Sequence, residues 1–77
     1  MGFLHMEFYH MNNGNYMVLI GSQAFKTAEV IGTHASKKRA QNQCDTDTRY
    51  IGPHEKRFVL TWSEVKKHMD QGWDIRI

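Results

Sequence analysis

The chain has 77 residues, of which 40% are hydrophobic, 12% aromatic and 23% charged. This composition is typical of a folded protein, and the length predicts a single domain over residues 1–77. A chain this short excludes a barrel or a dinucleotide-binding fold. The sequence also excludes a membrane-spanning helix, because no apolar run approaches the roughly 20 residues that such a helix needs.

The net charge and the single cysteine indicate the kind of cellular compartment to expect. The formal net charge is +2, which is only mildly basic. Cys44 is the only cysteine, so no intramolecular disulfide can form and the fold needs no oxidising compartment. The first residues lack the basic flank and long apolar stretch of a secretory leader. We therefore expect a cytoplasmic protein that does not bind membranes.

The first third of the chain predicts strands. Residues 3–10 alternate between apolar and polar side chains, and Asn13-Gly14 is typical of a hairpin turn between this segment and the next. Residues 16–20 form a continuous apolar run, which predicts a central strand buried on both faces. Residues 21–32 fit either a short helix or a third strand. We favour the strand, because a lone hairpin is only marginally stable.

The middle of the chain predicts a helix and then a loop. Ser36 is a good N-cap residue, and the helix that it begins is expected to run to about Cys44, with Ala40 and Cys44 on its inner face. Residues 45–55 are expected to form a loop with a turn at Gly52-Pro53.

The last third predicts strand, helix and strand. Residues 58–62 alternate as in a strand, and Thr61 and Glu64 have the spacing of a capping box. The helix that follows is expected to run to about residue 71 and to end at Gly72, before a strand over 73–77. The sequence therefore predicts an α+β fold: a small two-layer sandwich of a mostly antiparallel four- or five-stranded sheet with one or two short helices.

Positive charge is concentrated in residues 34–57. This segment holds six Lys or Arg residues against three acids, for a net charge of +3. Three of the cations occupy the first turn of the helix that Ser36 begins, where the helix dipole disfavours them. A bound anion would offset this mismatch. Together with one tyrosine, the six cations are the predicted partner- or anion-binding residues: Lys37, Lys38, Arg39, Arg49, Tyr50, Lys56 and Arg57.

The sequence lacks the patterns of catalytic and metal sites. The five histidines share no metal-ligand spacing, and Asp45-x-Asp47 fails the calcium-loop pattern at Arg49. Nothing pairs Cys44 with a base, so a small buried cysteine is the simpler interpretation. We expect no enzyme activity, no metal and no cofactor.

These observations favour a small binding protein that associates stoichiometrically with a protein or nucleoprotein, in the manner of an inhibitor or adaptor. Its nine aromatic and five methionine residues exceed what a thin core can enclose and suit an interface. In size it is similar to the small proteins that phages use against host machinery. The alternative is a nucleic-acid-binding module that contacts phosphates through segment 34–57. A homodimer is also a candidate state, with residues 17–20 and the C-terminal strand as the expected edges.

Overall fold

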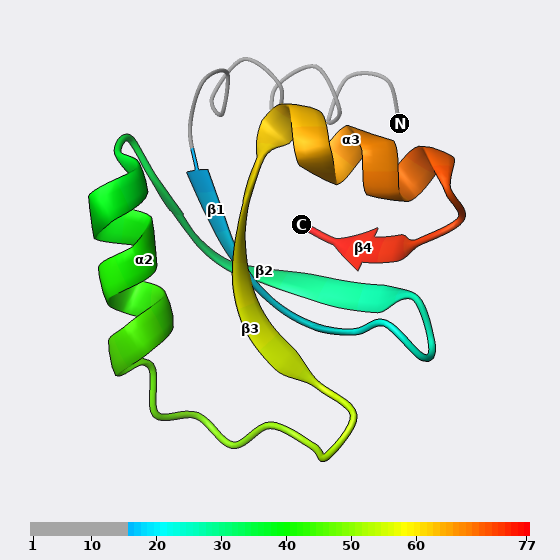
Figure 1. Ribbon diagram of the computed structural model, residues 1–77, viewed down its shortest axis with the longest axis horizontal. Coiled ribbons are helices and arrows are strands. Elements are labelled where there is room, and N and C mark those ends of the chain that lie inside the picture. Colours follow the sequence, from blue (N-terminus) through cyan, green and yellow to red (C-terminus); the bar gives the residue numbers. More distant parts are fainter. Residues whose placement is uncertain (1–15) are drawn as a thin grey trace.

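The computed structural model describes residues 16–77, which form a four-stranded sheet and two helices (Figure 1). The sheet has the strand order β3-β1-β2-β4. The elements in chain order are β1 (Tyr16–Ser22), β2 (Thr27–His34), α2 (Lys37–Thr46), β3 (Lys56–Thr61), α3 (Trp62–Asp70) and β4 (Asp74–Arg76).

β1 is the central strand and is paired along its length on both sides. Its pairing with β2 and its pairing with β3 are both antiparallel, and each begins at Tyr16. Met17, Val18 and Leu19 are fully buried, as expected for a strand covered on both faces. The predicted strand over 3–10 and its Asn-Gly turn lie outside the described residues.

One face of the sheet is covered by α3. Side chains alternate along a strand, so Met17 and Leu19 point to this face and Val18 to the other. The first two pack with Trp62 and Val65 of α3 and with Ile75 of β4. Burying these side chains away from water is the main favourable contribution to folding on this face.

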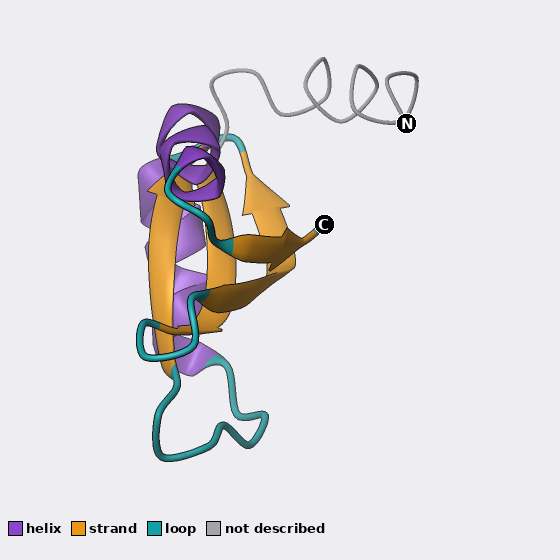
Figure 2. Cartoon of the chain, turned by 90° about the vertical axis from the view of Figure 1, so that its right-hand side faces the viewer, coloured by secondary structure: helices purple, strands orange, loops and turns teal. Residues whose placement is uncertain are grey.

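The opposite face is covered by α2, so the sheet lies between the two helices (Figure 2). Ala40 of α2 is fully buried, as predicted, whereas Cys44, also expected to be buried on the inner face, is only partly buried. The helix approaches closely at Gly32, where an added Cβ would lie 2.1 Å from the Gln43 side-chain oxygen. That oxygen accepts a hydrogen bond from His34 Nε2 at 2.5 Å, and the Gln43 amide donates to the Ile31 carbonyl at 3.3 Å. These bonds fix the helix against β2, next to the irregularity in β1–β2 pairing between Val18 and Leu19.

The ends of both helices are defined by the residues that the sequence indicates. The Ser36 hydroxyl accepts from the Arg39 amide at 3.2 Å, which caps α2. Thr61 and Glu64 form the reciprocal capping box that begins α3. Gly72 has a φ of 96°, a left-handed conformation that glycine adopts without steric cost and that ends a helix.

The predicted fold class is confirmed, with two refinements. The sheet is mixed, because β4 pairs with β2 in parallel. The helices are divided between the two faces, because β1 buries apolar side chains on both. Residues 27–34 are a strand, which settles the open choice for 21–32. Of the two edges expected for a homodimer, β1 is interior and only β4 is an edge. In the described part of the chain, no helix is long and apolar enough to cross a membrane.

Gly21 is where the sheet tolerates no side chain. An added Cβ would lie 2.7 Å from both the Ala28 Cβ and the Thr27 carbonyl oxygen, whereas at Gly52 the nearest atom is 3.4 Å away and belongs to a flexible glutamate. We predict that Gly21→Ala lowers the free energy of unfolding by about 1–3 kcal/mol, the usual cost of overpacking. Gly52→Ala is the matched control and should change it far less. Urea denaturation of the two variants measures the difference, and equal effects would contradict this packing.

Candidate functional site

The predicted binding residues fall into two separate groups. Lys37, Lys38 and Arg39 are exposed in the first turn of α2. The other four lie at the opposite end of this helix, in the following loop or at the start of β3. Ten helical residues span about 15 Å, so the two groups form separate patches at the two ends of α2.

The second group is organised by an acid, Asp47, which ends α2. Its carboxylate accepts from Arg49 Nε at 3.1 Å and from Arg57 Nε at 2.9 Å. Arg57 also donates through Nη2 to the Arg49 carbonyl. We call these three residues the arginine cluster. It ties the loop after α2 to β3 and keeps one net positive charge.

The hydrogen bond from Arg57 is the main reason that the pKa of Asp47 lies below its ordinary value, although partial desolvation opposes it. In the sequence Asp47 counts only as an acid that dilutes the basic segment. In the structure it brings Arg49 and Arg57 together. Tyr50, in the same loop, is 89% exposed.

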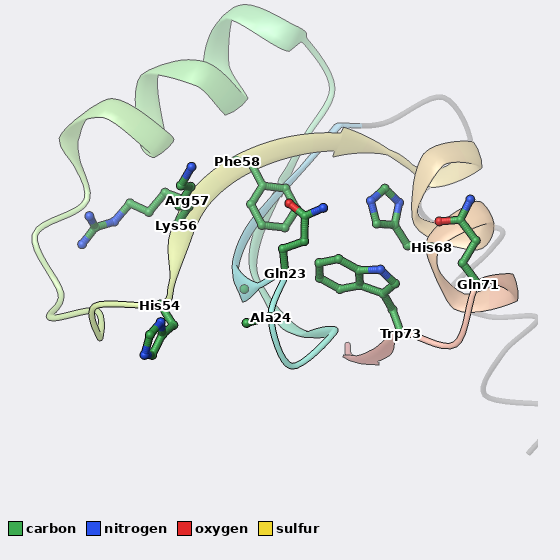
Figure 3. A pocket seen from close by; sticks show the side chains of 10 residues that line it. Gln23, Ala24, His54, Lys56, Arg57, Phe58, His68, Gln71 and Trp73 are labelled. Carbon is green, nitrogen blue, oxygen red and sulfur yellow. The ribbon is translucent and has the colours of Figure 1, made fainter.

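An open groove lies on the α3 face, at the end of the sheet that α3 does not cover (Figure 3). Its volume is about 450 Å³. Five parts of the chain contribute to it: the end of β1 and its turn, the loop before β3, the start of β3, the end of α3, and the residue before β4. The lining residues are Gly21, Gln23, Ala24, His54, Lys56, Arg57, Phe58, His68, Gln71 and Trp73.

The aromatic side of the groove is held by specific contacts. The His68 and Trp73 rings meet edge to face with centroids 5.0 Å apart. His68 Nδ1 lies 2.8 Å from the Glu64 carbonyl oxygen, and because a carbonyl only accepts, this nitrogen carries the proton. Phe58 and Trp73 are half-buried, so each still presents part of its ring. At the far end, His54 meets the exposed Phe25 edge to face at 5.9 Å.

The charges that line the groove are of one sign. Among the described residues that line it there is no Asp or Glu, whereas Lys56 and Arg57 are both present. Figure 3 shows Arg57 directed away from the groove, toward the loop after α2, so Lys56 is the cation that borders it. The nearby acids Glu29, Glu55 and Asp74 line a separate hollow of about 290 Å³ together with Ile20. Arg76 also lines this hollow, and none of the three acids lines the groove.

Most of the groove was not predicted from the sequence. Of its lining residues only Lys56 and Arg57 were singled out as binding residues. The aromatic, histidine and glutamine members come from segments that the strand order and α3 bring together, and no spacing in the sequence connects them. The one available signal was the excess of aromatic residues over what the core needs.

Cys44 and the Asp45-x-Asp47 pair lie at the C-terminal end of α2. Burial and the neighbouring Asp45 raise the pKa of the Cys44 thiol, which keeps it in the protonated, poorly nucleophilic form. The Asp47 carboxylate of the Asp45-x-Asp47 pair is already bound to two guanidinium groups. Within residues 16–77, no three His, Cys, Asp or Glu side chains are grouped as metal ligands would be.

The arginine cluster predicts a pH-dependent stability. Since the pKa of Asp47 is lowered from 3.8, the charged form favours the folded state. This stabilisation is present above the unfolded-state pKa and is lost as the pH falls through the folded-state pKa. Asp47→Asn should therefore lower the melting temperature at about pH 7 and make little difference at about pH 2. Asp45→Asn is the control, because that carboxylate accepts from the neutral Gln41 amide. A deficit in Asp47→Asn that is equal at both pH values would contradict the assignment.

The chain matches no protein-family model, and neither the curated proteins nor the solved structures show significant similarity to it. The function proposed below therefore rests on the geometry and charge of the open groove.

Proposed function

We propose that this chain is a non-enzymatic binding protein that acts by stoichiometric association with a protein or nucleoprotein partner, and that it holds an acidic segment of that partner in the open groove. The observation that carries the proposal is the lining of the groove. It combines aromatic rings, amide groups and a cation, and its described lining residues include no acid.

Each kind of lining group suits a peptide segment. Phe58 and Trp73 are half-buried, so an apolar side chain of a partner that packs on them removes further ring surface from water, which favours binding. Aromatic residues contribute much of the binding energy of many protein interfaces. The amides of Gln23 and Gln71 can donate to and accept from a peptide backbone. Lys56 favours a carboxylate, and charge complementarity of this kind provides selectivity and speeds association.

The charge distribution favours a protein segment over nucleic acid as the ligand. A phosphate backbone requires a continuous track of uncommitted cations. Here the basic residues of 34–57 are divided between the two ends of α2, and Arg49 and Arg57 share a carboxylate. The groove itself offers one lysine, which suits one or two carboxylates better than a chain of phosphates.

The proposal predicts the kind of peptide that the protein selects. Display of random peptides on the immobilised full chain should enrich sequences that combine Asp or Glu with aromatic or aliphatic residues. Lys56→Glu should weaken the affinity for these peptides by about tenfold or more, because it places like charges together. Lys38→Glu makes the same charge change in the first turn of α2 and should leave the affinity unchanged. Fluorescence anisotropy of labelled selected peptides measures both.

Two outcomes would contradict the proposal. The first is selection of peptides without acidic residues, or of peptides whose affinity Lys56→Glu does not change. The second is tight binding of DNA or RNA that weakens steeply with salt and is lost in Lys38→Glu, which would establish the nucleic-acid function instead.

A further inference from the structure

β3 is an edge strand of the sheet and borders the groove. The strand order places it outermost, and among the described strands it pairs only with β1. Figure 1 shows it passing in front of β1 and β2, between α2 and α3. In an edge strand, every second residue points its backbone amide and carbonyl groups away from the sheet. The two helices pack on the faces of the sheet, so they do not pair with these outward groups of β3.

The side chains of β3 divide between the two faces. Lys56 and Phe58 point to the α3 face and line the groove, while Arg57 and Val59 point to the α2 face. From Arg57 to Thr61 the strand is half-buried, so part of its apolar surface remains in contact with water. Proteins usually protect such an edge with charges or a covering segment. β3 carries its charges only at its first two residues.

We infer that the acidic partner segment binds as an extended strand added to the outer edge of β3. This inference rests on the proposed function and specifies the mode of binding. Backbone hydrogen bonds to β3 would supply affinity, and every second side chain of the added strand would enter the groove. Cross-strand pairing then places an acidic residue opposite Lys56 on the groove face, and β-branched or aromatic residues opposite Phe58, Val59 and Leu60.

The charge of β3 argues against a second copy of this chain as the added strand. β3 contains no Asp or Glu, so a second β3 cannot supply an acid opposite Lys56 or Arg57. A partner segment that joins acidic residues to a short run of β-branched residues matches β3 along its length. Its acids pair with the basic start of β3, and its β-branched residues pair with the apolar remainder.

The test uses capped peptides and the unmodified full-length protein. The parent probe is the hexapeptide Thr-Val-Thr-Val-Glu-Glu, which in antiparallel pairing brings its glutamates to Lys56 and Arg57. Two further versions carry N-methyl groups on alternate residues, one version for each set of amides. In a strand pair only one set of amides bonds to β3. One methylated peptide should therefore bind at least about tenfold more weakly than the parent and the other about equally well. A Gln-Gln version is the charge control and should bind more weakly than the parent.

The readouts are affinity by anisotropy and hydrogen exchange of the β3 amides by NMR. Slowed exchange at alternate β3 amides with the parent peptide is the expected result. Equal binding by all methylated versions would overturn the strand mode and leave acidic recognition standing. Equal binding by the Gln-Gln version would overturn the acidic partner. At about 1 mM even weak binding is measurable, so no binding of the parent peptide at that concentration would overturn the inference. The peptide selection would still test the proposed function separately. A dimer of the free protein with protected β3 amides would show that a second copy occupies the edge.

Discussion

The structure depends on one constraint, which is that β1 buries apolar side chains on both of its faces. Met17 and Leu19 point one way and Val18 the other, and all three are inaccessible to water. Each face therefore needs its own cover. α3 covers one and α2 the other, while β2 and β3 occupy the two edges. In a chain of 77 residues this uses both described helices, and α3 leaves one end of its face open as the groove.

The open groove is a consequence of that limited cover. α3 begins directly after β3 and leaves the sheet at Gly72, so it shields Leu19 but does not reach the end of β1. At that end Gly21 contributes no side chain, and its contact with Ala28 leaves no room for one. Phe58 and Trp73 then border a hollow. On the other face, the arginine cluster fixes the loop after α2 and draws Arg57 away from the groove. Lys56 is left as the cation beside the aromatic rings.

Local signals were sufficient to predict most of the elements. The Ser36 cap, the capping box of Thr61 and Glu64, and the stop at Gly72 each act within a few residues of the chain, so the sequence displays them directly. The apolar run from Tyr16 likewise predicted a central strand. Local turn chemistry does not show which strands occupy the two edges of that strand. β3, more than thirty residues later in the chain, takes one of them.

The candidate site was less predictable than the fold. The sequence showed six cations in one segment. In the structure α2 separates the three in its first turn from the three that follow it, and Asp47 forms ion pairs with Arg49 and Arg57. The groove is lined by Phe58, His68 and Trp73, and the last two are in ring contact. Their proximity follows from the packing of α3 and β4 and from no motif. Composition indicated that aromatic residues were in excess. The tertiary structure was needed to show where they gather and which charges accompany them.

The central claim is that the groove beside β3 is the surface through which this protein binds its partner. NMR chemical-shift mapping of the full chain, with an acidic peptide obtained by selection against it, tests this claim most directly. The largest changes are expected at Lys56, Phe58 and the Trp73 indole. Changes centred on Lys37, Lys38 and Arg39, with the groove unaffected, would contradict it.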